Sequence, residues 1–356
     1  MKLIDFDGLP AARKTKHIMS KTIKTGVSYF GNRNPRHFAS DLEEIIDHNC
    51  NFIVHTFSEN DQEYYKDTVG EMIALSKDAG LECYLDPWGI GRVFGGEAYS
   101  KFALLNRDAC QIFPDGKSAP AACLNHPLFR DFMRKWIDDA ADIGAQVLFW
   151  DEPHFFINLK EKQRFEIWHC RCGCCSERFF KRFQKSFTEA TVEEITIFRD
   201  ESVVEFLSEL CRQGRAKGMK NALCLLPFRD AALGLSDWSK AAAIAEIDIF
   251  GTDPYWMFFD KNVRQYVGDY AREVQRLSQK FQKEAQIWIQ AYKIAAGREE
   301  ELKEAIAVAY AEGVRNFAAW SYYGNAYMSY NRSDNPQKVW DVLGAVYGEL
   351  RRGEWG

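Results

Sequence analysis

The sequence predicts a single (β/α)8 barrel, the α/β fold in which eight parallel strands alternate with eight helices. Short apolar segments alternate eight times with longer amphipathic segments along the chain. Several amphipathic segments end in a glycine just before the next apolar segment, as helix C-caps commonly do. The length of 356 residues is normal for such a barrel with loop insertions, and no shift in composition marks a second domain.

Eight short segments are the predicted strands. Most of them are apolar runs without polar alternation, which is typical of strands that are buried on both faces. They span residues 26–30, 51–56, 82–86, 146–151, 222–227, 247–252, 286–290 and 315–320.

Amphipathic segments between these strands are the predicted helices, because their apolar residues recur three and four positions apart. The capping glycines are Gly80, Gly144, Gly218 and Gly313. Residues 1–25 are polar and mixed, so we expect an N-terminal extension before a barrel domain of residues 26–356. An open, doubly wound sheet is the alternative, but no GxGxxG or GxxxxGK[ST] motif follows the first strand to support a nucleotide site.

Composition narrows the possible partners. The formal net charge is −5 and no Lys/Arg stripe is interleaved with aromatic residues, which argues against a nucleic-acid partner. The N-terminus lacks the apolar stretch of a signal peptide, and no segment reaches the roughly 18 consecutive apolar residues of a membrane helix. We therefore expect a cytoplasmic protein that binds carbohydrate and has no membrane partner. A homo-oligomer is compatible with the sequence.

Carboxylates and aromatic rings collect just after the predicted strands, where barrels of this kind place their chemistry. This combination suits a sugar, because rings cover its apolar face while charged groups bind its hydroxyls. The predicted catalytic residues are Glu152, Asp253 and Asp151. The predicted substrate-binding residues are His55, Asp86, Trp88, His154, Trp256, Gln290, Tyr292 and Trp320.

The most specific of these strand ends is the segment VLFWDEPHFF, in which an apolar run stops at Asp151 and Glu152. The following Pro153 keeps Glu152 out of the helical region. Neighbouring strand residues point to opposite faces, so we expect one acid to reach into the cleft and the other to brace it. The structural interpretation is that Asp151 accepts backbone N–H bonds in a tight turn and Glu152 is a solvated loop residue. Asp253 leaves the sixth strand in the same way before Pro254, although Asp-Pro is also an ordinary turn initiator.

Histidines His55 and His154 have two interpretations. Either could act in catalysis or bind substrate, but a lone histidine is more often a structural residue with its hydrogen bonds satisfied.

Cysteines concentrate in the segment WHCRCGCCSERF, where Cys170, Cys172 and Cys175 are spaced so that three thiolates can converge on one ion. Cys123 is the best candidate for the fourth ligand, and His169 or Cys174 are the alternatives. Closed thiolate sites are structural, so we predict a structural Zn²⁺ that staples the long insertion after the fourth strand, and no organic cofactor. A redox-active thiol cluster and a group of unrelated free cysteines are the other interpretations.

Together these segments resemble the β-galactosidases of glycoside hydrolase family 42. In that family a cysteine before the third barrel helix joins a Cys-x-Cys-x-x-Cys cluster after the fourth strand to hold zinc. The matching residues are Cys123 in ACLNHPLFRDF and Cys170, Cys172 and Cys175 in CRCGCCSERF. The resemblance covers residues 26–345 as architecture, and residues 120–185 as sequence.

The larger clan of retaining glycosidases carries its acid/base in an Asn-Glu-Pro at the end of strand four, which Asp151-Glu152-Pro153 resembles. This implies the acid/base role for Glu152. The clan's nucleophile is a glutamate that ends strand seven, but this chain has Gln290 there, and an amide cannot form the glycosyl ester. Asp151 and Asp253 also resemble the strand-four and strand-six acids of α-galactosidase-type barrels.

Hydrolysis of a glycosidic bond in a small glycoside or oligosaccharide is the predicted function. Glu152 is the preferred acid and Asp253 or Asp151 the second carboxylate, and the missing strand-seven glutamate favours inversion, with that second carboxylate activating water. One alternative is a barrel that binds carbohydrate without cleaving it. Another is a lyase or isomerase with a catalytic metal held by His55, Glu152 and Asp253.

Overall fold

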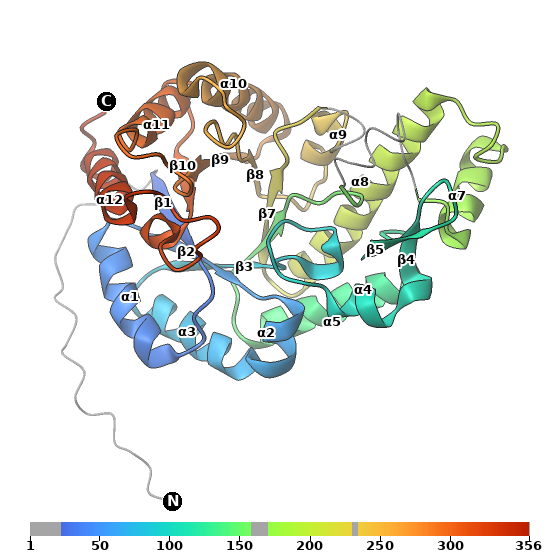
Figure 1. Ribbon diagram of the computed structural model, residues 1–356, viewed down its shortest axis with the longest axis horizontal. Helices are drawn as coiled ribbons and strands as arrows, with labels where there is room; N and C mark the ends of the chain where they lie inside the picture. Colours follow the sequence, from blue (N-terminus) through green and yellow to red (C-terminus); the bar gives the residue numbers. More distant parts are fainter. Residues whose placement is uncertain (1–22, 158–169, 230–233, 356) are drawn as a thin grey trace, which may run out of the picture.

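Eight parallel strands close into a barrel in the computed structural model, which describes residues 23–157, 170–229 and 234–355 (Figure 1). The order around the barrel is β1-β10-β9-β8-β7-β6-β3-β2, and β1 pairs with both β10 and β2 to complete the closure. The strands are β1 (Lys24–Tyr29), β2 (Phe52–Thr56), β3 (Glu82–Asp86), β6 (Val147–Asp151), β7 (Lys220–Leu225), β8 (Ile249–Thr252), β9 (Glu284–Gln290) and β10 (Asn316–Trp320).

Alternate residues of each strand fill the barrel interior. Phe52, Phe149 and Trp288 belong to this inner cluster, which is separate from the larger apolar layer between strands and helices. Gly26 in β1 makes room for it, because a Cβ atom there would lie 2.4 Å from the Phe52 ring. The inner layer is therefore a packed floor, and open space begins only above it, at the C-terminal ends of the strands.

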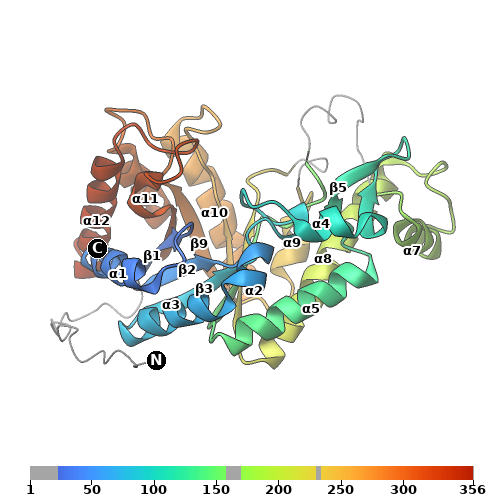
Figure 2. The same cartoon turned by 60° about the horizontal axis from the view of Figure 1, so that its bottom comes forward.

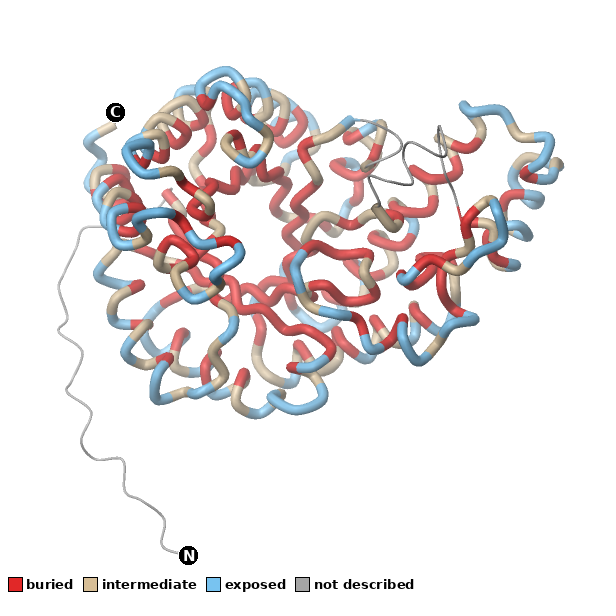
Figure 3. The backbone as a smooth tube through the Cα atoms, in the orientation of Figure 1, coloured by how far each residue is buried: buried red, intermediate tan, exposed pale blue. Residues whose placement is uncertain are grey.

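Helices surround the barrel with buried inner faces and exposed outer faces (Figure 3). Gly80, Gly144, Gly218 and Gly313 have φ between +83° and +97°, which confirms the predicted C-capping glycines. The helices of the wall are α1 (Pro35–Asp47), α2 (Glu59–Tyr64), α3 (Lys66–Asp78), α5 (Pro127–Asp142), α8 (Val192–Ala216), α9 (Trp238–Ala242), α10 (Val263–Phe281), α11 (Glu301–Ala311) and α12 (Pro336–Arg352).

Two insertions extend one side of the barrel, away from α1 and α12 (Figure 2). The first follows β3 and contains α4 (Lys101–Leu105) and the antiparallel hairpin of β4 (Cys110–Ile112) and β5 (Ser118–Ala122). The second follows β6 and contains α7 (Gly173–Phe183). Short 3-10 turns complete the loops at Ile90–Arg92, Arg107–Ala109 and Tyr322–Asn325.

The predicted barrel and its eight strands are confirmed, and only strand boundaries differ. β1 begins at Lys24, two residues before the predicted start, so residues 24 and 25 belong to the barrel and not to the extension. Residues 1–22 of the predicted extension lie outside the described part of the chain. Within that described part, no helix has the length and apolar character needed to cross a membrane.

Candidate active site

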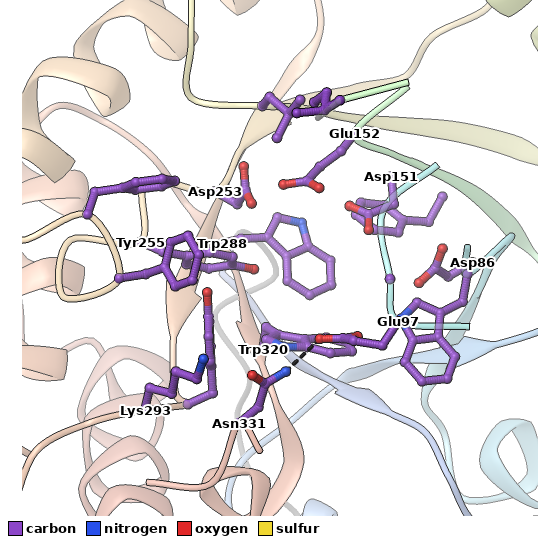
Figure 4. A pocket seen from close by; sticks show the side chains of 18 of the residues that line it. Asp86, Glu97, Asp151, Glu152, Asp253, Tyr255, Trp288, Lys293, Trp320 and Asn331 are labelled. Carbon is purple, nitrogen blue, oxygen red and sulfur yellow. Dashed lines mark hydrogen bonds between the residues drawn. The ribbon is translucent and has the colours of Figure 1, made fainter. Parts of the chain in front are cut away.

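A cavity of about 440 Å³ opens at the C-terminal ends of the barrel strands (Figure 4). Five carboxylic side chains line it, together with a larger number of aromatic rings and one lysine. The acids are Asp86, Glu97, Asp151, Glu152 and Asp253. The site therefore lies where the strand-end residues predicted it.

Strand alternation aims three of the acids into the cavity. Asp86 and Asp151 end β3 and β6, two positions beyond the inward-facing Tyr84 and Phe149. Asp253 follows β8 at the corresponding place and is 3% exposed. Side chains two residues apart share one face of a strand, so the buried interior fixes where these carboxyl groups point.

Glu152 reaches the same cavity through a local break in this alternation. Its φ is +41°, an uncommon left-handed conformation that turns its side chain to the side on which Asp151 lies. Both acids line the cavity, so the expectation that one of them only braces the other is wrong. A Cβ atom on Gly95 would lie 2.2 Å from Asp151 Oδ2 and 2.9 Å from Glu152 Oε2, so only a glycine can pack against this pair.

The carboxyl groups of Glu152 and Asp253 face each other in the cavity, from the ends of barrel strands four and six (Figure 4). Their interaction raises the pKa of Asp253 and lowers that of Glu152. Two neighbouring carboxyl groups can hydrogen-bond to each other only when one of them holds a proton. Inversion stays a prediction.

Burial is the largest cause of the altered acidity of all five acids. It raises the pKa of Asp86, Asp151 and Asp253 well above the usual range, and the repulsion of neighbouring carboxylates adds to the effect. The pKa of Glu152 is also raised by burial, an effect partly offset by its interaction with the Asp253 carboxyl group. Carboxyl groups that keep their protons near neutral pH are suited to act as general acids.

Aromatic rings form the floor and walls of the cavity. Trp288 stands at its base against Phe149, with 4.7 Å between ring centroids, and Tyr255 meets Tyr292 edge to face at 5.2 Å. Trp320 ends β10 and lies 6.3 Å from Trp88. These rings offer apolar faces beside the carboxyl groups, as a sugar site requires.

The rim on the β10 side is closed by a hydrogen-bonded loop. Asn331 donates from Nδ2 to Glu97 Oε1 at 2.5 Å, and its carbonyl oxygen accepts from the Lys293 amide at 3.0 Å. Lys293 is the one cation among the described residues that line the cavity, and its Nζ lies 4.1 Å from the centre of the Tyr330 ring.

Four of the predicted substrate-binding residues line the cavity, namely Asp86, Trp88, Tyr292 and Trp320. The other four have structural contacts elsewhere. His55 is an outward-facing strand residue, 1% exposed, whose Nε2 lies 3.1 Å from Ser76 Oγ in the helix layer, and burial lowers its pKa to about 3. His55 therefore does not meet Glu152 and Asp253 in one cluster, so these three residues do not form the metal site of the lyase or isomerase alternative.

His154, Trp256 and Gln290 hold loops in place. The His154 ring contacts the Glu152 carbonyl oxygen, and burial lowers the pKa of this histidine to about 4. Trp256 is fully buried and donates to Glu301 Oε2 at 2.7 Å. Gln290 Oε1 accepts from the amides of Met257 and Phe258, so this side chain fixes the loop that follows Asp253.

Glu97, Phe149, Trp288 and Asn331 were missed as cavity residues. Phe149 and Trp288 lie two positions before Asp151 and Gln290, so strand alternation could have placed them on the inner face. The pair Gly95-Gly96 before Glu97 marks a close backbone approach, because a Cβ atom on Gly96 would overlap the Trp88 ring at 1.7 Å. Asn331 lies in an irregular loop, and the sequence carries no signal for it.

The predicted cysteine cluster is brought together outside the barrel. Cys123, Cys170, Cys172 and Cys175 are buried, and their sulfur atoms lie within 4.8 Å of one another. Cys123 Sγ is 3.4 Å, 3.5 Å and 3.8 Å from the sulfur atoms of Cys175, Cys172 and Cys170. Four sulfurs about 2.3 Å from one ion would be about 3.8 Å apart, so the donor set fits a tetrahedral metal site.

The surroundings of the cluster also suit bound thiolates. The Ile112 amide lies 3.4 Å from Cys170 Sγ, and Asn125 Nδ2 lies 3.3 Å from Cys175 Sγ, so both can donate to sulfur. Cys174 is outside the group and His169 lies outside the described residues. The cluster joins the end of the β4–β5 hairpin to the start of α7, tying the two insertions together.

Comparison with known proteins supports the fold. No model of a known protein family matches the sequence, and no curated protein does. Among solved structures, the β-galactosidase from the psychrophilic Marinomonas ef1 superposes with a TM-score of 0.66 at 11% identity, over 92% of this chain and 59% of that one. This chain therefore spans about three-fifths of that enzyme's length.

Other similar structures cover a range of sugar chemistry. The endo-β-1,4-mannanase from Thermotoga petrophila gives a TM-score of 0.58 at 11% identity, over 94% of this chain and 77% of that one. D-psicose 3-epimerase gives 0.51 at 10% identity, over 94% of this chain and all of that one. At these identities the likeness shows a barrel of the type found in glycoside hydrolases, and the chemistry must come from the site itself.

Proposed function

We propose that this protein hydrolyses glycosidic bonds in small glycosides or oligosaccharides, using carboxyl groups at the C-terminal face of the barrel. The observation that supports it best is the pair of facing carboxyl groups of Glu152 and Asp253 above a floor of aromatic rings. A pair that shares one proton contains one acid and one base, which are the two groups that glycoside hydrolysis needs.

In the proposed reaction Glu152 protonates the glycosidic oxygen, and the bond from that oxygen to the anomeric carbon breaks. The ionised Asp253, or Asp151, attacks the anomeric carbon and forms a glycosyl ester. Water then cleaves the ester and gives its proton back to Glu152. Inversion, with the second carboxylate activating water for direct attack on the anomeric carbon, is the alternative course.

Burial raises the pKa of both groups, and their interaction raises that of Asp253 further and lowers that of Glu152, so the proton of the pair can be held by either group. Either acid could therefore deliver it once substrate separates them. Loss of the true acid slows substrates with poor leaving groups far more than aryl glycosides with activated leaving groups, whereas loss of the nucleophile slows both.

The test is a screen of aryl glycosides and disaccharides with the wild-type protein, Glu152→Gln and Asp253→Asn. We expect each variant to fold and to lose about 10²–10⁴ of kcat/KM on disaccharides. Asp47→Asn, at an exposed position on α1, is the matched control and should retain full activity. Retention of activity in both variants would refute the site, and binding of sugar without cleavage by the wild type would favour a non-catalytic barrel.

We also propose that the four clustered cysteines hold a structural zinc ion. Zinc prefers a tetrahedron of thiolates and has no redox chemistry, which suits four buried cysteines that close every coordination position. When bound, the ion would link the two insertions and leave no position for substrate.

A further inference from the structure

The cavity holds more acids than the proposed reaction uses. Glu152, Asp253 and Asp151 account for the acid, the nucleophile and its alternative, but Asp86 and Glu97 also line the cavity. Figure 4 shows these two on the side away from Asp253. Asp86 is 2% exposed, and its Oδ1 atom has no hydrogen-bond partner among the residues that the structure describes. A buried carboxylate oxygen that faces a cavity without a partner is costly unless a ligand donates to it.

Aromatic rings beside these two acids provide a second, independent feature. Trp88 and Trp320 have ring centroids 6.3 Å apart, and Phe30 packs 5.4 Å from Trp88 and 4.9 Å from Trp320. The faces of aromatic rings carry partial negative charge and attract cations, most strongly for tryptophan. Rings and carboxylates together form the kind of site that binds an ammonium group.

The charge of the whole cavity points the same way. Its described lining contains five carboxyl groups and one lysine, and no arginine or histidine. Lys293 is held at the rim over the Tyr330 ring. A neutral sugar needs hydrogen-bond acceptors for its hydroxyls, and one or two carboxylates provide these. The further carboxyl groups are either protonated, as their raised pKa values favour in the free protein, or ionised beside a positive ligand that stabilises their charge.

We propose that the substrate is a glycoside of an amino sugar whose amine is free and protonated, with the ammonium bound between Asp86, Glu97 and the faces of Trp88 and Trp320. The Asn331 amide orients Glu97 toward this position by its 2.5 Å hydrogen bond. The cleavage of such a glycoside rests on the proposed hydrolase function, but the binding of the ammonium group does not.

Kinetics on matched aryl glycosides test the specificity. Each of the gluco, galacto and manno series is compared as the 2-amino sugar, its N-acetylated form and the neutral hexose. We expect one free amino sugar to exceed its two partners in kcat/KM by about 10- to 100-fold, the range of one charge-assisted hydrogen bond to a buried carboxylate. Asp86→Asn should reduce this preference by a similar factor, whereas the control Asp47→Asn should leave it unchanged.

Binding provides a readout that does not depend on turnover. Calorimetry with free glucosamine, galactosamine and mannosamine against the matching neutral hexoses should show tighter binding of an amino sugar, weakened by Asp86→Asn. If amino sugars bind in this way but no glycoside is cleaved, the hydrolase proposal fails and the ammonium site stands. Equal binding of amino and neutral sugars, or binding of Ca²⁺ or Mg²⁺ in preference to any amino sugar, would overturn the ammonium site.

Discussion

Replacing Cys172 with serine is expected to release one zinc ion per chain and to loosen both insertions without unfolding the barrel. The sulfur separations of 3.4–3.8 Å around Cys123 place a central ion about 2.1–2.3 Å from each sulfur, close to the usual zinc–sulfur distance. Cys123 and Cys170 are 47 positions apart in the sequence. Cross-linking a loop of that length is worth about 4 kcal/mol in chain entropy on the scale used for disulfides.

Metal content and local stability can be measured together. Protein purified without chelators should contain one zinc by plasma mass spectrometry, and X-ray absorption should show four sulfur neighbours at about 2.3 Å. Cys172→Ser should lose the metal and become sensitive to proteases in the β4–β5 hairpin and at the start of α7. Cys174→Ser is the matched control, because Cys174 is next to the cluster in sequence but outside it. Equal metal loss in the two variants, or wild-type protein without metal, would refute the assignment.

Three further predictions concern the cavity and its surroundings. Gly95→Ala should lower turnover about 100-fold with little change in stability, because its Cβ atom would displace the carboxyl groups of Asp151 and Glu152, whereas Gly268→Ala, with no heavy atom closer than 4.0 Å, should not change turnover. Asp86→Asn should raise the melting temperature, and the gain should grow from about pH 4 upward. The pKa of Asp86 is higher in the folded protein than in the unfolded chain, so the wild-type protein loses stability as the pH rises from the unfolded value toward the folded one, and asparagine removes this loss. A gain in melting temperature that does not vary with pH would contradict the prediction. His55→Ala should open a cavity in the helix layer and lower the free energy of unfolding, measured in urea, by about 2–4 kcal/mol, with kcat/KM unchanged. A loss of kcat/KM would show that His55 acts in the site.

Strand alternation explains which parts of the site could be predicted from sequence. The apolar strands locate the barrel, and the acids at their ends locate its working face, so Asp86, Asp151 and Asp253 were accessible to this reasoning. Strand alternation, applied strictly, also excludes His55 from the cavity. In β2, Phe52 and Val54 fill the interior, so His55 must face the helices.

Loops set the limit of the prediction. The position of Glu152 depends on a left-handed φ of +41°, which runs of apolar residues do not reveal. Glu97 and Asn331 meet across 234 positions of sequence, at a contact made by two irregular loops. Motif spacing was more informative for the cysteines, because the chemistry of a thiolate site restricts both the residue type and the distances.

Gln290 takes the place of the glutamate that the family resemblance places at the end of strand seven (β9). Its amide accepts hydrogen bonds from the amides of Met257 and Phe258 and donates to the Tyr292 carbonyl at 3.0 Å, so both ends of the side chain are used by backbone. A carboxylate there would lose the donor and face that carbonyl oxygen unpaired. The glutamine instead fixes the loop that begins at Asp253, the acid whose carboxyl group faces that of Glu152. The seventh barrel strand, β9, thus positions the acid that follows the sixth, β8. The reacting pair in the proposed mechanism comes from the ends of the fourth and sixth barrel strands, β6 and β8.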